Sequence, residues 1–213
     1  MSNPYKTERN YENLQKRIFD GVGLYRIPAL EPVQLETIPD FIGFNYVRGC
    51  DEPEGHGVHF FIDDYQFIRL WSNPDRYTDR LRQFDCVCTP DFSTYTDFPM
   101  VIQLYNHYRK HWLGAYWWEQ GIKVIPTIGW SDRKSFRWCF DGEPVGGTVA
   151  ISSVGTQKNR AAMELFRLGY AEMQKRLKPS KVLFWGCVPE GLEADNIIQI
   201  KSFQQKWREK DIE

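Results

Sequence analysis

Residues 84–130 constrain the fold of this chain more than any other stretch of the sequence. Residues 84–89 form a short apolar run, a polar turn follows at 90–93, and residues 100–120 carry aromatic side chains at helical spacing. A second apolar run occupies residues 122–127. A strand, a helix and a strand in this order predict a βαβ unit, in which a crossover helix connects two parallel strands.

The same alternation continues along the chain and predicts an α/β fold. The further strands are expected at 41–47, 58–62, 148–152 and 181–187, and the further helices at 65–82, 159–177 and 197–207. The later strands are almost continuously apolar, which is typical of parallel strands covered on both faces. Parallel strands with crossover helices predict an incomplete or short (β/α) TIM-like barrel, since six strands are fewer than the eight of a closed barrel. An open doubly wound sheet is the alternative.

The 213 residues are predicted to form a single α/β domain without an internal linker or repeat. An N-terminal helix and an extended lead-in are expected in residues 1–40, the βα core in 41–190 and a C-terminal helix in 191–213. Within the core, a polar, glycine-rich loop separates the strands at 41–47 and 58–62, so these two strands could form a hairpin.

Composition and charge argue against some classes of protein. The formal net charge is −1, which disfavours a general nucleic-acid coat protein, because such proteins bind through excess lysine and arginine. No stretch is apolar over the 18 or more residues of a membrane span, and the N-terminus lacks the apolar centre of a secretory signal. Five cysteines, an odd number, without such a signal predict reduced thiols in a cytoplasmic protein.

Polar residues follow the predicted strands, where both α/β architectures bind their ligands. Asp63 and Asp64 follow one strand, Asp91 follows the next, and Asp132 lies shortly after the strand at 122–127. Neighbouring carboxylates repel, which raises the pKa of one of them and favours acid–base chemistry or a divalent metal ion. Asp63, Asp91 and Asp132 are therefore the candidate catalytic residues. Helix capping by such side chains is the simpler interpretation.

The loop before the helix at 159–177 is small and rich in hydroxyl groups. Its sequence is Ser152-Ser153-Val154-Gly155-Thr156, and the free backbone N–H groups at a helix start favour anions. With Lys158 nearby, the loop predicts contact with a phosphate-bearing small molecule, although it lacks the Gly-Lys-Ser/Thr of a P-loop. A capped helix N-terminus is the simpler interpretation. The candidate ligand-binding residues are Asp64, Ser93, Trp130, Ser153, Gly155, Thr156 and Lys158.

Two residue pairs have spacings that bear on metal binding. His107 and His111 are four residues apart on the predicted helix at 100–120, which could place both on one face, as in some zinc sites. The glutamate of a His-Glu-x-x-His motif does not follow His107, so a solvated or half-buried helix face is the favoured interpretation. Cys86 and Cys88 point to one side of a strand and are expected in the core. The sequence leaves open whether a metal or another cofactor is bound.

Several short motifs resemble a known family. They are Thr89-Pro90-Asp91-Phe92-Ser93, the aromatic helix after it, Val124-Ile125-Pro126-Thr127-Ile128-Gly129-Trp130, and the late Ser152/Gly155 loop. Together they resemble a domain of unknown function found in uncharacterised bacterial and bacteriophage proteins, common in Firmicutes and mobile elements, over residues 43–189. The resemblance implies a phage or mobile-element gene that acts in a host cytoplasm, and it implies no established activity.

Three functions from different classes are compatible with these observations. The first is an enzyme or binding protein for a phosphate-bearing small molecule. The second is a nucleic-acid-associated protein that uses the basic helix at 159–178, and the third is a protein–protein interaction module acting on a host factor. The first is favoured, because polar residues gather at the strand ends while the net charge gives the second no support. The oligomeric state stays open.

Overall fold

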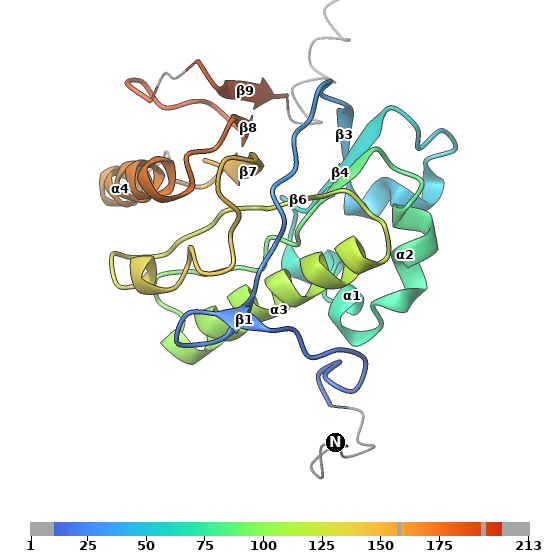
Figure 1. The fold of residues 1–213 in the computed structure, drawn as a ribbon. Coiled ribbons are helices and arrows are strands. Elements are labelled where there is room, and N and C mark those ends of the chain that lie inside the picture. The colour runs from blue at the N-terminus through green and yellow to red at the C-terminus, as the bar shows by residue number, and fades with distance from the viewer. Residues whose placement is uncertain (1–10, 157–158, 193–194, 202–213) are drawn as a thin grey trace, which may run out of the picture.

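The computed structural model describes residues 11–156, 159–192 and 195–201, and parallel strands form its centre (Figure 1). One sheet has the order β3 (Asp40–Gly43), β4 (His56–His59), β5 (Cys86–Cys88) and β6 (Val124–Ile125). The other has the order β7 (Thr148–Ser152), β8 (Lys181–Trp185) and β9 (Ile197–Ile200). Every strand pair in these two sheets is parallel, so the predicted parallel α/β class is confirmed.

The two sheets join where β6 meets β7. Thr127 and Ala150 form an isolated parallel bridge, and the backbone N–H of Ile128 donates to the Ala150 carbonyl oxygen at 2.8 Å. The strands therefore follow one another in chain order from β3 to β9, without the reversal of order that defines a doubly wound sheet. Within the described part of the chain, β9 does not pair with β3, so no closed barrel forms.

The hairpin considered for the first two core strands is wrong. β3 and β4 are parallel, in a register that runs from Asp40 opposite His56 to Gly43 opposite His59. Parallel neighbours need a crossover of about a dozen residues. The segment between these strands meets that need, because it contains the 3₁₀ helix η1 (Phe44–Gly49) and a further loop.

The two long predicted helices are confirmed to within one residue at each end. They are α3 (Met100–Glu119) and α4 (Arg160–Leu177), and the Asn159 side chain accepts from two backbone N–H groups in the first turn of α4. The helix predicted at 65–82 is divided into three short pieces, with Pro74 at the start of the last one. These pieces are η2 (Asp64–Gln66), α1 (Arg69–Ser72) and α2 (Asp75–Leu81), and η3 (Ser135–Arg137) lies between β6 and β7.

Both predicted terminal helices differ from the structure. Residues 197–200 form strand β9 instead of a helix, because their isoleucines pair in register with the edge strand β8, and residues 202–207 lie outside the described part. Residues 11–20 form turns, and residues 1–10 are likewise outside it. A short antiparallel pair, β1 (Gly21–Val22) and β2 (Ile27–Pro28), follows these turns.

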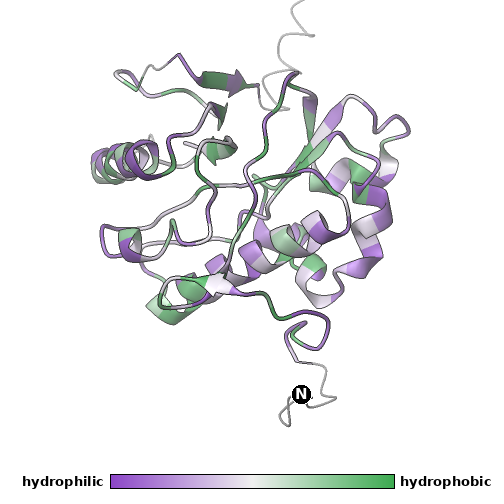
Figure 2. Ribbon diagram, viewed as in Figure 1, coloured by the Kyte–Doolittle hydropathy of each residue, from purple (hydrophilic) through white to green (hydrophobic). Residues whose placement is uncertain are grey.

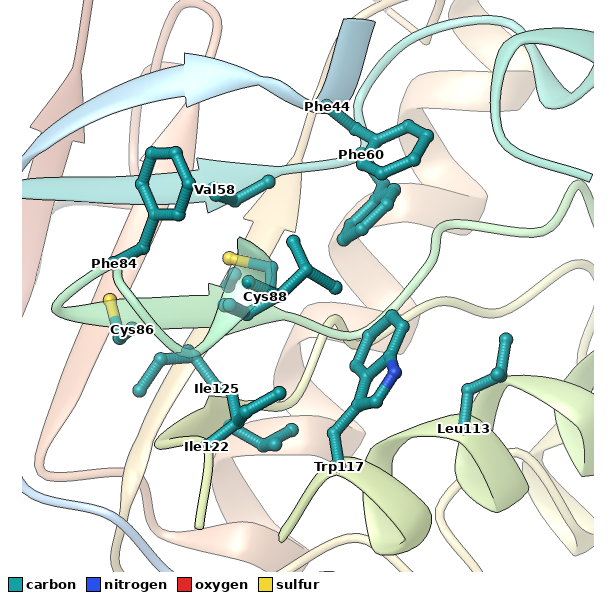
Figure 3. Packing of buried hydrophobic residues seen from close by; sticks show 14 of the residues in the cluster. Phe44, Val58, Phe60, Phe84, Cys86, Cys88, Leu113, Trp117, Ile122 and Ile125 are labelled. Atoms are coloured by element: carbon teal, nitrogen blue, oxygen red, sulfur yellow. The ribbon is translucent and has the colours of Figure 1, made fainter. Parts of the chain in front are cut away.

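The larger of two core clusters lies between the strands and α3. Figure 3 shows Leu113 and Trp117 of α3 pointing toward the strands that carry Cys88 and Ile125, and all four side chains are fully buried. The expected core position of Cys86 and Cys88 is confirmed, and burial raises the pKa of the Cys86 thiol to about 12. Figure 2 shows hydrophobic colour concentrated on the central strands, whereas the helices around them are mixed.

The sheet curls so that side chains of its two halves meet inside. Trp185 of β8 lies with its ring centroid 5.0 Å from Phe41 of β3, and 4.7 Å from Phe61 after β4. At the N-terminal ends of the strands, the Thr148 N–H donates to the Val33 carbonyl oxygen at 2.7 Å. The extended lead-in thus covers this end of β7, while the C-terminal strand ends face a cavity.

The cysteines and the helices bear on the predicted cytoplasmic location. The five cysteines form no disulfide bond with one another. Among the helices that the structure describes, none has the length and apolarity needed to cross a membrane. A cytoplasmic location stays a prediction.

Candidate functional site

A cavity of about 500 Å³ lies at the C-terminal ends of β5, β6 and β7. Three loops line it, one after each of these strands, together with Phe61 and the first turns of α4. The lining side chains with polar groups are those of Asp91, Ser93, Thr94, Tyr95, Thr96, Trp130, Ser131, Ser152 and Thr156. Carboxyl ends of parallel strands are where α/β proteins bind their ligands, so this cavity is the candidate functional site.

The structure brings six of the predicted site residues together. Asp91, Ser93, Trp130, Gly155 and Thr156 line the cavity itself. Asp64 stands behind Ser93 and holds it through two hydrogen bonds, one from the Ser93 hydroxyl at 2.8 Å and one from its backbone N–H at 3.1 Å. The carboxylate of Asp64 therefore fixes the loop that carries Ser93.

The other predicted residues lie elsewhere or have structural roles. Asp63 is exposed and lies outside the cavity lining. Asp132 accepts from the backbone N–H groups of Lys134 and Ser135 at 2.8 and 3.2 Å, so it caps η3. Ser153 is buried and donates to the carbonyl oxygen of Cys187 at 2.8 Å, which ties the loop after β7 to the loop after β8. Lys158 lies outside the described residues.

Asp91 has the most altered acidity in the cavity. Burial raises the pKa of this carboxyl group, the negative charge of Asp64 raises it further, and the ammonium group of Lys110 partly opposes the shift, so that the pKa is about 6. The repulsion expected between neighbouring carboxylates thus acts between Asp64 and Asp91, although burial is the larger cause. A carboxyl group with this pKa exchanges its proton readily near neutral pH.

The loop after β7 is a weaker anion site than its sequence predicts. The backbone N–H groups of Ser153, Val154 and Thr156 already donate within the protein, to the carbonyl of Trp185, the hydroxyl of Ser152 and the carbonyl of Ser153. Gly155 lies between them with a φ of +87° and open space around its Cα. Any anion at this loop would therefore depend mainly on hydroxyl groups and on the positive end of α4.

Trp130 provides the largest aromatic surface in the lining. Its ring centroid lies 5.4 Å from that of Phe166 in α4, and Phe166 lines the cavity as well. A Cβ atom at Gly169, one turn further along α4, would overlap the indole ring, so this glycine makes room for Trp130. The cavity thus offers aromatic surface on one side and Asp91 with hydroxyl groups elsewhere.

A second polar cluster lies next to this cavity, buried against α3. Its members are His107, Lys110, His111 and Glu143, and the relative exposures of His107 and His111 are 3% and 0%. The interpretation of the histidine face as solvated or half-buried is therefore wrong, because the segment around Glu143 covers it. Sequence reasoning missed Lys110 and Glu143, since nothing in the local sequence links α3 to a residue 32 positions beyond His111.

Lys110 connects the cluster to the cavity. Its ammonium group donates to Glu143 Oε1 at 2.6 Å and to the Thr127 carbonyl oxygen at 2.8 Å, and its charge also acts on Asp91. Burial by itself would raise the pKa of Glu143, but the charges of Lys110 and His111 outweigh it and lower that pKa. Glu143 is therefore held as a carboxylate.

The fold and cavity define a parallel α/β protein with a ligand-sized site at its strand ends. The chain belongs to the family of the domain of unknown function DUF4417, which matches residues 19–204. It is 43% identical to the Gene 1 protein of Mycobacterium phage L5 over 192 residues, covering 89% of this chain and 82% of that protein. It is 36% identical to the Gene 1 protein of Mycobacterium phage D29 over 191 residues, covering 89% and 70%. No solved structure matches the chain significantly. The resemblance to a domain of unknown function shared with bacteriophage proteins is confirmed.

Proposed function

We propose that this protein binds a small, phosphate-bearing polar molecule in the cavity at the ends of β5, β6 and β7, and that Asp91 transfers a proton to or from it. The observation that carries the proposal is a carboxyl group with a pKa of about 6 in the lining of a 500 Å³ cavity. Titratable groups with strongly shifted pKa values concentrate at functional sites.

The lining favours a ligand with a flat or apolar face and several hydroxyl groups. Trp130 and Phe166 can stack against a base or a sugar ring, and Ser93 and Thr156 can exchange hydrogen bonds with hydroxyl groups. A nucleoside or sugar phosphate has these properties, and the cavity volume lies within the range of about 300–1,000 Å³ usual for small ligands. Its phosphate would lie toward Gly155 and the N-terminal end of α4, away from the negative charge of Asp91 and Asp64.

Asp91 is the proton-transfer group in this proposal. Near neutral pH it accepts a proton from a ligand hydroxyl or amine and returns it in a later step. Asp64 does not need to touch the ligand, because it acts through the Ser93 loop and through its charge on Asp91. Asp64 is therefore a positioning residue.

We also infer that the architecture is an incomplete (β/α) barrel. The parallel strands follow in chain order, and Trp185 and Phe41 of its two halves pack together inside the curl. This supports a site at the C-terminal face, as in barrel enzymes.

A thermal-shift titration with nucleotides and sugar phosphates, each paired with its unphosphorylated parent, tests the proposed function. A ligand that binds the folded state raises the unfolding midpoint by mass action, by an amount equivalent to about 2.7 kcal/mol at a hundred times its Kd. We expect a rise with at least one phosphorylated compound, and we expect Asp91→Asn and Trp130→Ala to reduce it strongly. Asp63→Asn is the matched control, because Asp63 is an exposed carboxylate outside the lining, and it should respond like the wild type.

The outcomes separate the parts of the proposal. An equal shift with a phosphorylated compound and its parent would remove phosphate from the ligand class. A protein that shifts with none of these compounds, or whose shift survives Asp91→Asn and Trp130→Ala, would refute a ligand site in this cavity.

The two other functions stay predictions, with less support from the structure. On the basic helix α4, Arg167 donates to the Glu190 carbonyl oxygen at 2.6 Å, and Arg176 bonds to Glu172 and to the Phe136 carbonyl. These guanidinium groups serve contacts within the protein, which weakens the case for a nucleic-acid surface on this helix.

A further inference from the structure

We propose that His107, His111 and Glu143 form a zinc site in the interior of the protein, between α3 and the segment after η3. The proposal rests on the geometry of this buried cluster and is independent of any ligand in the strand-end cavity. Zinc is bound by imidazole nitrogens and carboxylate oxygens, and two histidines with one glutamate form a known zinc-binding set.

The three side chains converge from distant parts of the sequence. Each offers one ligand atom, and these atoms all lie within 4.8 Å of one another. His107 and His111 are adjacent on one face of α3, with ring centroids 4.4 Å apart. His111 Nε2 lies 3.0 Å from Glu143 Oε1. Two donors that share a tetrahedral zinc ion at about 2.0–2.1 Å are separated by roughly 3.3 Å, so the cluster is close to the required size.

Backbone carbonyl groups orient the rings of both histidines. His107 Nε2 lies 3.0 Å from the Asp141 carbonyl oxygen, and His111 Nδ1 lies 2.9 Å from the Pro28 carbonyl oxygen. A carbonyl oxygen can only accept, so these two nitrogens carry the hydrogen atoms. The remaining nitrogens are Nδ1 of His107 and Nε2 of His111. Without a metal, Nε2 of His111 donates to Glu143 Oε1 at 3.0 Å, and a zinc ion would replace this proton and bind the lone pair that it leaves. Metal-binding histidines usually donate their other ring N–H to a carbonyl or carboxylate in this way.

One carboxylate oxygen of Glu143 makes no hydrogen bond with the described residues. Lys110 donates to Oε1, whereas Oε2 is buried and has no hydrogen-bond partner among the described residues. Buried polar atoms in native proteins are nearly always paired, so an unpaired carboxylate oxygen at the centre of such a cluster points to a missing cation. The unpaired Oε2 leaves Glu143 able to bind a cation in addition to its hydrogen bond with Lys110.

The backbone around the cluster is shaped to bring its parts together. Gly142 has a φ of +79°, and a Cβ atom there would lie 2.5 Å from the Pro28 carbonyl oxygen and 2.8 Å from His111 Nδ1. A glycine therefore lets the segment that carries Glu143 press against both His111 and the carbonyl that orients it.

A metal at this position would join three separate parts of the chain. His107 and His111 belong to α3, Glu143 belongs to the segment after η3, and the Pro28 carbonyl belongs to β2. All three ligands are buried, so the ion would be taken up as the protein folds. Its free energy of binding would then add to the free energy of folding.

Metal analysis of the full-length protein tests the site. The protein is purified without metal-affinity tags, treated with a chelator, given zinc and dialysed, and its metal content is measured by mass spectrometry. We expect one zinc ion per chain and a lower thermal midpoint for the chelated protein, restored by adding zinc. Cobalt(II) should bind in place of zinc and give the visible absorption bands of a low-symmetry site.

Single substitutions identify the ligands. His107→Gln and Glu143→Gln should each retain less than a tenth of the zinc and lose the midpoint rise, with folding checked by circular dichroism. His56→Gln is the control, because His56 lies on β4 away from the cluster, and it should keep the full zinc content.

A wild-type protein that retains no zinc and is unaffected by chelator would overturn the proposal, and the cluster would then be a Lys110–Glu143–His111 ion-pair network. Zinc retained equally by both cluster variants would overturn it as well. These results do not depend on the strand-end cavity, which the nucleotide titration tests separately.

Discussion

At the scale of single residues, Asp91 has an environment that opposes its own charge. Burial and the nearby Asp64 raise its pKa to about 6, from an ordinary value of 3.8. The folded protein therefore holds this proton more tightly than the unfolded chain does. As pH rises from about 4 to about 6, the contribution of this group to stability falls, and its full cost is present above pH 6. Such costs are common where a charge serves function.

Asp91→Asn should therefore stabilise the protein in a pH-dependent manner. The amide carries no charge, so we expect the free energy of unfolding to rise by about 1–2 kcal/mol at pH 7.5 relative to the wild type. At pH 3, where the carboxyl group of the wild type is mostly protonated in both the folded and the unfolded state, the difference should nearly vanish. Urea unfolding of both proteins at the two pH values measures this. A variant destabilised equally at both pH values would contradict the charged, buried state of Asp91.

The site residues that the sequence could predict are those that follow strands directly. Asp91 and Ser93 come within a few residues of the end of β5. The prediction of that strand was therefore enough to place them at the cavity. Asp132 has the same kind of sequence position, but it caps η3, because the choice between capping and lining depends on how the loop folds back. Glu143 could not be predicted, since its partners on α3 are distant in the sequence and meet it through tertiary packing.

At the scale of elements, α4 and the strand-end cavity depend on each other through Gly169. A glycine inside a helix usually costs about 0.5–1 kcal/mol relative to alanine. Here it accepts the indole ring of Trp130, which lines the cavity. Gly169 lowers the intrinsic stability of the helix, but it allows close contact between Trp130 and α4.

Gly169→Ala should consequently destabilise the protein despite its higher helix propensity. The added methyl group overlaps the indole ring, and overpacking of this kind costs about 1–3 kcal/mol. Urea unfolding followed by circular dichroism measures the change. The control is Ala171→Gly in the same helix, because Ala171 is exposed and its replacement should cost only about 0.5–1 kcal/mol through propensity. A Gly169→Ala protein as stable as the wild type would mean that Trp130 does not pack on α4.

The type and limits of a helix or strand could be predicted best where the element is long and its hydrophobic pattern is regular. The helices α3 and α4 have many turns of consistent pattern, and their predicted limits are correct to within one residue. The run at 197–200 is too short for a period to distinguish strand from helix, and pairing with β8 decides its structure. The direction of β4 relative to β3 is likewise set by tertiary pairing, since the intervening loop permits either direction.

At the scale of the whole molecule, Trp185 connects the two halves of the curled sheet. It lies in β8, yet the centroid of its ring is 5.0 Å from that of Phe41 in β3 and 5.4 Å from that of His59 in β4. Along the backbone the halves meet at the bridge between Thr127 and Ala150. Interior packing through Trp185 therefore contributes to holding β3 and β4 near β8, in addition to the hydrogen bonds at that bridge.

Trp185→Ala should loosen both halves of the sheet and not β8 alone. Removing a buried tryptophan costs about 3–5 kcal/mol, and the cavity it leaves is bordered by side chains of both halves. Hydrogen exchange followed by mass spectrometry should therefore show faster exchange in β3 and β4 as well as in β7 and β8. Trp118→Ala is the control, because Trp118 is 42% exposed on α3 and its loss should leave exchange in both halves unchanged. Faster exchange confined to β7 and β8 would mean that the halves are independent inside the curl. Because Phe61 contacts Trp185 and also lines the cavity, loosening of both halves would further predict weaker binding in the strand-end cavity of the variant.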